Sequence, residues 1–167
     1  MSATPAAVSG WCTFRVAGRL CGLDVTRVQE VLRPQPVTPL PLAPPAVRGL
    51  LNLRGRIVPA VDLRAVLGLP APEAAAPAGH LVVFDGDSPV SLLVDAIGDV
   101  RRSGDCALVP VPHTLEGPAR DLIAGAVPLP DDLLLALDLD RILERAFAGA
   151  GADPTTGRPP RPAGGTR

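Results

Sequence analysis

The chain has 167 residues, 47% of them hydrophobic and only 2% aromatic, so it suits one compact domain, or two very small ones, with an aliphatic core. Its formal net charge is -1 and all 16 basic residues are Arg, which excludes the strongly basic surface of a general nucleic-acid binder. No apolar run approaches the ~18 residues that cross a bilayer, and the N-terminus lacks a basic and apolar leader, so we expect a cytoplasmic protein without direct membrane insertion.

Both ends of the chain are predicted to be disordered tails. Residues 1–9 are small and polar, and residues 149–167 consist almost entirely of Gly, Pro, Arg, Thr and Ala. Such segments bury too little apolar surface to offset the entropy lost on ordering. The folded body is therefore expected over residues 10–148.

The first predicted elements form a hairpin. Apolar residues alternate with polar ones from Cys12 to Val16, and after a break at Gly18 the alternation resumes from Cys21 to Val25. Two such runs around a glycine are typical of antiparallel strands. The stretch over residues 25–32 that follows fits a helical turn or a strand.

A second hairpin is predicted from residues 50–53 and 56–61, joined by Arg54 and Gly55. Pro59 lies within its second strand, and because proline lacks an N–H group we expect that strand at a sheet edge. Asp62 can then cap a short helix that Gly68 ends.

The remaining elements are a third hairpin, a late strand and a terminal helix. Residues 81–84 and 90–97 pair across residues 85–88, which fit a hairpin turn better than a calcium loop because the later ligands are missing. Residues 133–137 are a predicted strand, and Asp138 caps an amphipathic helix whose apolar stripe runs to Phe147 and which Gly149 ends. A weak internal repeat predicts two subdomains, roughly 22–78 and 79–138, with the terminal segments crossing over.

The inventory of reactive side chains is poor. The two histidines, His80 and His113, have no Ser or Cys partner suggested by spacing, so both are predicted to be surface or loop residues. Cys12, Cys21 and Cys106 are scattered without a C-x-x-C pair, which favours small buried hydrophobes over a disulfide or zinc site. We therefore expect no catalytic residues, no metal and no cofactor.

The tip of the second hairpin is the most informative feature. Gly55 allows the positive φ that such a turn requires, and Asn52 can tie the turn through side-chain hydrogen bonds. These residues place the Arg54 guanidinium in solvent on a rigid support. Arg54 is then either an interface anchor or an ordinary solvated arginine, and the residues alone leave both open.

This segment resembles the signature of the CheW-like family of chemotaxis coupling proteins, a pattern close to G-x-x-N-x-R-G-x-I-x-P-V-x-D-L-R. The matching residues are Gly49, Asn52, Arg54, Gly55, Ile57, Pro59, Asp62, Leu63 and Arg64. Further family blocks match in order through Gly22, Asp24, Val28 and Glu30, and through Val94, Asp95 and Val100. The resemblance covers about residues 10–145.

The resemblance implies an all-β fold of two intertwined five-stranded SH3-like barrels with short helices, one of them at the C-terminal end. It implies a non-catalytic adaptor that couples chemoreceptors to the histidine kinase CheA. The receptor tip would pack near a groove between the barrels and the regulatory domain of CheA would dock on the barrel rims. The adaptor would be a monomer when free and part of receptor arrays when bound. The partner-binding residues implied are Val28, Glu30, Gly49, Asn52, Arg54 and Gly55.

A ligand-binding or enzymatic small β-barrel is the alternative function. It would require a polar cavity with converging acids or histidines.

Overall fold

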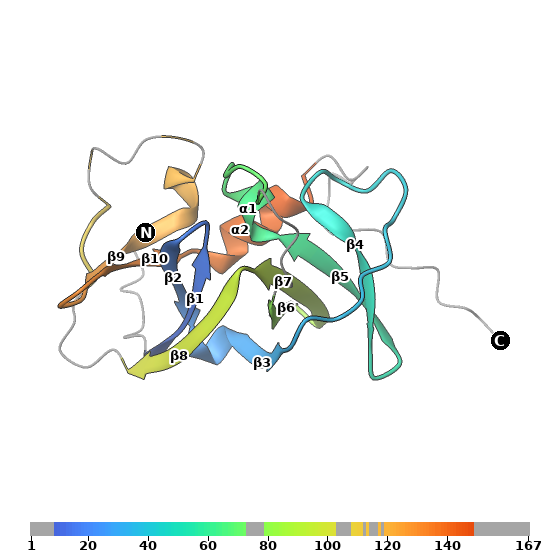
Figure 1. The fold of residues 1–167 in the computed structure, drawn as a ribbon, viewed down its shortest axis with the longest axis horizontal. Coiled ribbons are helices and arrows are strands. Elements are labelled where there is room, and N and C mark those ends of the chain that lie inside the picture. Colours follow the sequence, from blue (N-terminus) through green and yellow to red (C-terminus); the bar gives the residue numbers. More distant parts are fainter. Residues whose placement is uncertain are drawn as a thin grey trace.

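The computed structural model describes residues 9–72, 79–102, 108–111, 113, 117 and 119–148. Apart from Ser9, the predicted tails lie outside these residues, as does Cys106. The described part consists of two five-stranded sheets and a few short helices (Figure 1), which confirms the predicted all-β fold.

One sheet, here called barrel 1, contains the N-terminal hairpin and the last strands of the chain. Its order is β8 (Ala96–Arg102), β1 (Gly10–Val16), β2 (Arg19–Asp24), β10 (Leu133–Leu137) and β9 (Ile123–Pro128). β2 and β10 run parallel, whereas the other neighbours are antiparallel.

The other sheet, barrel 2, is built from the middle of the chain. Its order is β3 (Val28–Leu32), β6 (Gly79–Asp85), β7 (Ser88–Val94), β5 (Arg56–Asp62) and β4 (Val47–Leu53). β5 and β7 form its parallel pair. The chain enters barrel 2 through a 3₁₀ turn at Val25–Arg27 and returns to barrel 1 at Asp95, between β7 and β8.

This strand order does not match the expected division near residue 78. β6 and β7 pair with strands from residues 28–62 rather than with the C-terminal strands, so barrel 2 spans Val28 to Val94 and barrel 1 takes both ends of the chain. The internal repeat compares hairpins along the sequence. It carries no information on the long-range parallel pairs that decide sheet membership.

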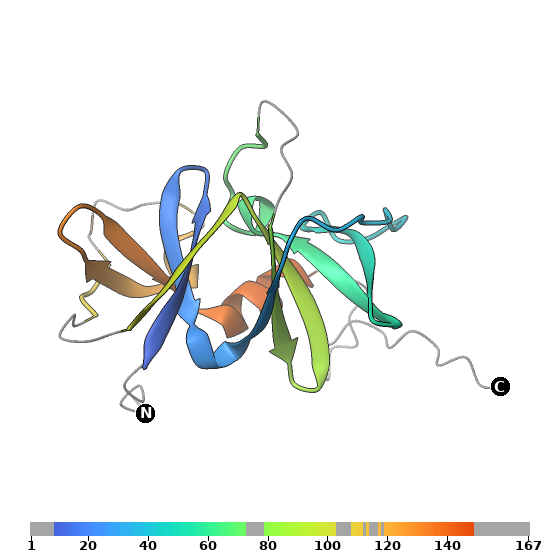
Figure 2. The same ribbon diagram turned by 60° about the horizontal axis from the view of Figure 1, so that its bottom comes forward.

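A single core joins the two barrels. Phe14 and Leu23 of barrel 1 belong to the same buried cluster as Val61 and Leu92 of barrel 2. The helix α2 (Leu139–Ala146) lies between the barrels (Figure 2) and inserts Ile142, which is fully buried, into that cluster. The barrels therefore share one apolar core.

The predicted helix caps are confirmed. Asp62 accepts a hydrogen bond from the Arg64 backbone N–H (3.0 Å) at the start of α1 (Leu63–Val66). Asp138 accepts one from the Arg141 N–H (3.2 Å) at the start of α2. Each carboxylate satisfies a donor that the first helical turn leaves unpaired.

The three hairpins and the late strand are also confirmed, with two differences. β7 ends at Val94 and residues 96–102 form β8, because Asp95 marks a crossover between the barrels. The edge position expected from Pro59 is wrong, since β5 lies between β7 and β4. Pro59 is tolerated because the parallel pairing with β7 begins only at Ala60. The missing N–H group of Pro59 therefore breaks no hydrogen bond of that pairing.

Candidate functional site

The β4–β5 turn holds Arg54 at the end of a rigid hairpin. Both turn residues have positive φ, 52° at Arg54 and 82° at Gly55, as in the tight turns that match strand twist. The Gly55 N–H donates to Asn52 Oδ1 at 2.9 Å, which confirms the expected tie across the turn. The local sequence therefore fixes the backbone from which the Arg54 side chain projects.

Arg54 forms a bidentate ion pair with Glu30 of β3. Nη1 lies 3.0 Å from Oε1 and Nη2 lies 2.7 Å from Oε2. The Arg54 side chain is 72% exposed, whereas that of Glu30 is 20% exposed. The pair thus joins the hairpin tip to an edge strand of barrel 2 and holds the guanidinium plane in one orientation while leaving much of it in solvent.

Four of the six predicted site residues therefore form one surface, which we call the hairpin platform: Glu30, Asn52, Arg54 and Gly55. Exposed apolar side chains lie on the same strands, Val31 on β3 (44% exposed) and Ile57 on β5 (55% exposed). An exposed arginine held in a fixed orientation on a strand turn is typical of a protein-binding surface.

Val28, the fifth predicted residue, lies at the start of β3 with its side chain half-buried against the shared core. It links the platform strand to the junction between the barrels. Val28 therefore packs mainly against the shared core and offers only a small exposed area to a partner.

Gly49, the sixth predicted residue, is buried in β4 rather than exposed. A Cβ atom placed on it would lie 2.0 Å from the Thr38 carbonyl oxygen. Thr38 and Leu50 exchange two backbone hydrogen bonds of 2.8 Å, which hold the Thr38 segment over the strand. Gly49 thus acts through the backbone, by letting this segment cross β4 closely.

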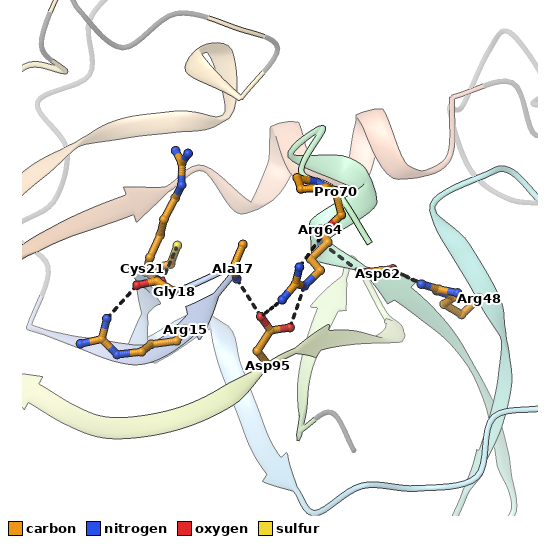
Figure 3. A network of polar contacts seen from close by, with 10 residues as sticks. Arg15, Ala17, Gly18, Cys21, Arg48, Asp62, Arg64, Pro70 and Asp95 are labelled. Carbon is orange, nitrogen blue, oxygen red and sulfur yellow. Dashed lines mark hydrogen bonds and ion pairs between the residues drawn. The ribbon is translucent and has the colours of Figure 1, made fainter. Parts of the chain in front are cut away.

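A second polar cluster, the junction cluster, lies where the barrels meet (Figure 3). Arg64 of α1 donates to both oxygens of Asp95, at 3.0 and 2.5 Å, and Asp95 also accepts from the Ala17 N–H (2.7 Å) at the β1–β2 turn. The hydrogen bonds from Arg64 are the main cause that lowers the pKa of Asp95. One carboxylate therefore links α1, the crossover and the hairpin tip of barrel 1.

The role of Asp95 could not be predicted from the sequence, because its partners Arg64 and Ala17 lie 31 and 78 residues away along the chain. The available signal was its place directly after a buried strand together with Arg64 in the resembling motif. Beside the cluster, Asp62 adds an ion pair with Arg48 of β4 at 2.7 Å to its capping bond (Figure 3).

His80 corrects a further expectation, since it is buried rather than at the surface. Its Nδ1 lies 2.8 Å from Ser91 Oγ, and its Nε2 accepts the Gln35 N–H at 3.1 Å. His80 is 1% exposed and Ser91 0%. Although the pair has the spacing of a Ser–His dyad, its second nitrogen is occupied by backbone and neither side chain faces solvent, so its role is structural. His113 is exposed, as predicted.

The cysteines that the structure describes behave as core residues. Cys12 and Cys21 are free and buried, and burial raises the pKa of the Cys21 thiol to about 12. A thiol of that pKa is protonated at neutral pH and is a poor nucleophile or metal ligand. Across residues 9–72, 79–102 and the described parts beyond them, no three His, Cys, Asp or Glu side chains gather as a metal site. In the same part of the chain, no helix is long and apolar enough to cross a membrane.

Comparison with known proteins gives a consistent result. The family model described as the CheW-like domain matches residues 11–147. The chain is 31% identical over 129 residues to a protein named chemotaxis protein CheW from Rhizobium meliloti, covering 77% of this chain and 83% of that one. It is 27% identical over 132 residues to chemotaxis protein CheW from Bacillus subtilis, covering 79% and 85%.

A solved structure agrees with the fold. The scaffolding protein TtCheW from Thermoanaerobacter tengcongensis superposes with a TM-score of 0.72 at 25% identity, covering 81% of this chain and 92% of that one. The similarity thus extends over the two-barrel body rather than over one hairpin.

Proposed function

Because the chain belongs to the CheW-like family of chemotaxis proteins, we propose that it is a non-catalytic adaptor that couples chemoreceptor cytoplasmic tips to the histidine kinase CheA. The observation that carries this proposal is the hairpin platform, in which a 72% exposed Arg54 is held by Glu30. It presents a charged group in a fixed orientation on a rigid strand, which suits protein recognition.

The six partner-binding residues of the proposal remain Val28, Glu30, Gly49, Asn52, Arg54 and Gly55. The residues of the hairpin platform and the exposed part of Val28 would contact the partner proteins directly. Gly49 acts by positioning β4 beneath the segment at Thr38. The receptor would occupy the region near β3 and the groove between the barrels, and the regulatory domain of CheA would dock on the barrel rims.

Modest affinity at each surface is sufficient for such an adaptor. Within a receptor array, simultaneous contact with two partners multiplies the individual affinities through effective concentration. The adaptor would act in the cytoplasm, bound to membrane receptors through its partners and not by its own insertion.

Co-elution tests the adaptor proposal. The purified chain is mixed with a CheA fragment containing the regulatory domain and with a receptor cytoplasmic fragment, both from the source organism, and the mixture is separated by size-exclusion chromatography. We expect a complex containing all three proteins. Arg56→Ala, which removes another exposed arginine of the same hairpin, is the control and should still form this complex. Elution of the chain alone in every mixture, or a stoichiometric cofactor released on its denaturation, would instead support a ligand-binding barrel.

A further inference from the structure

β8 presents an unpaired strand edge. It is the terminal strand of the barrel 1 sheet and pairs with β1 on one side only. Six of its seven residues are exposed, and Val100 is 60% exposed. No strand among the described residues covers its outer edge, whereas β9 at the other end of the sheet carries a bridge between Val109 and Ala126. An open edge of this kind is a template for pairing with another strand.

The backbone groups of Val100 face this open edge. The Asp99 carbonyl accepts a hydrogen bond from the Thr13 hydroxyl of β1. The Arg101 carbonyl oxygen also faces β1, since it lies 3.0 Å from the position of a Cβ atom on Gly10. Because the N–H and C=O groups of successive strand residues alternate in direction, those of Val100 point away from β1.

The sequence around Val100 is self-complementary in one antiparallel register. When two β8 strands pair about a two-fold axis at Val100, the two Val100 residues exchange both backbone hydrogen bonds, and each Asp99 lies opposite the other chain's Arg101. These flanking pairs are of the non-hydrogen-bonded type, in which side chains approach most closely.

The neighbouring registers are unfavourable. An axis at Asp99 sets the two Asp99 carboxylates opposite one another, and an axis at Arg101 does the same for two guanidinium groups. A two-fold axis that passes between two successive residues would place a residue whose backbone groups point outward opposite one whose groups point toward β1, so these two residues could not exchange hydrogen bonds. Only the register centred on Val100 joins open backbone groups and opposite charges.

We propose that two copies of this chain associate through antiparallel β8–β8 pairing centred on Val100, joining their two barrel 1 sheets. The pairing is short, and a bulge where Gly98 and Asp99 both lie opposite Thr13 limits its extension toward Ala96. Arg101 also lines the same hollow as Asp131 and Asp132 of its own chain, whose negative charge draws it away from the pairing although Asp132 is already bound to Arg15. The dimer therefore forms at high local concentration, and the dilute chain is a monomer.

Complementary charge variants test the pairing. Asp99→Arg gives the edge two arginines and Arg101→Asp gives it two aspartates, so each variant alone repels its own copy. A mixture of the two restores opposite charges at both flanking positions. In sedimentation experiments on concentrated samples, we expect the wild type and the mixture to approach twice the monomer mass and each variant alone to remain monomeric.

Control variants separate the effect of the β8 charges from a general effect of charge. Asp87→Arg and Arg56→Asp change the same charges on exposed sites of barrel 2, and we expect wild-type self-association for both. Circular dichroism of every variant checks that it is folded. Hydrogen exchange at the Val100 amide should slow as the concentration of the wild type rises.

A wild-type chain that stays monomeric in concentrated solution, with Val100 exchange independent of concentration, overturns the proposal. So does self-association that persists in both single β8 variants, since it must then use another surface. This outcome is separate from the adaptor proposal, because binding of CheA or receptor does not require β8 pairing.

Discussion

At the scale of single residues, Arg54 combines exposure with restraint. Its backbone has a φ of 52°, which is uncommon for a residue with a side chain, and Glu30 holds both of its terminal nitrogens. Since the Arg54 side chain is largely in solvent, the pair contributes little to folding, at most about 1 kcal/mol. Its value lies in orienting the guanidinium.

The sequence predicted the exposure of Arg54 and the Asn52 tie because turn chemistry is local. It did not reveal that Glu30, placed in the site by resemblance alone, is the partner of Arg54, since 24 residues separate them. The error at His80 has a similar cause. Its partners, Gln35 and Ser91, come from two other segments that meet only in the folded barrel.

The buried His80 predicts a pH dependence of stability. Burial lowers its pKa below the ordinary value of 6.5, so the folded state keeps the ring neutral while the unfolded state binds a proton. Its contribution is therefore fully present above pH 6.5 and is lost as the pH falls from there through the lowered pKa of the folded state. Urea unfolding should show a lower unfolding free energy at mildly acidic pH than at neutral pH.

The variant His80→Gln provides the control, because it removes the titrating group while keeping hydrogen-bonding capacity. We expect a lower stability at neutral pH but a flatter dependence below it. An equally steep loss in the variant would assign the acid sensitivity to other groups.

At the scale of elements, two glycines of the β4–β5 hairpin serve different purposes. At Gly49 both the space and the backbone oppose a side chain, since a new Cβ atom would lie 2.0 Å from the Thr38 carbonyl oxygen and φ is 153°. At Gly55 the space is open and only the φ of 82° opposes a side chain. Gly49→Ala should therefore cost about 2 kcal/mol or more through a forced backbone shift, and Gly55→Ala about 1 kcal/mol.

Chemical unfolding of both glycine variants measures this difference. Equal losses would mean that the Thr38 segment moves aside freely and that Gly49 has no positioning role.

The start of α1 offers a second test at this scale. Asp62 both caps the helix and pairs with Arg48, and the residue is 8% exposed. Asp62→Ala removes both interactions and should lower the unfolding free energy by about 1–2 kcal/mol. Arg48→Ala, which removes a half-exposed arginine from the ion pair and leaves the capping hydrogen bond in place, should cost less. A thermal melt of Asp62→Ala identical to that of the wild type would contradict the capping role.

At the scale of the whole molecule, the shared core ties two barrels into one folding unit. The hairpins were predictable because alternation and turn residues are local signals. The division between barrels was not, because it depends on the parallel pairs β5–β7 and β2–β10, which join distant segments. Asp95 marks the point at which the chain returns to barrel 1, and it holds the β1–β2 turn there.

This organisation predicts one cooperative unfolding transition. The single Trp, Trp11, lies in a small cluster of barrel 1 and reports on that barrel by fluorescence, whereas far-ultraviolet circular dichroism reports on both. We expect the two urea transitions to coincide. Asp95→Ala should shift both together to lower urea, and a variant in which the fluorescence transition comes first would show that the barrels are only loosely coupled.

The most direct test of the adaptor account is calorimetric titration of Arg54→Ala and Arg56→Ala with the CheA regulatory domain and with the receptor fragment. The account predicts that Arg54→Ala, while keeping a wild-type melting curve, weakens binding of at least one partner by about 2 kcal/mol or more, roughly 30-fold in Kd. Arg56→Ala should bind both partners nearly as the wild type does. Unchanged affinity of Arg54→Ala for both partners would contradict the role of the hairpin platform.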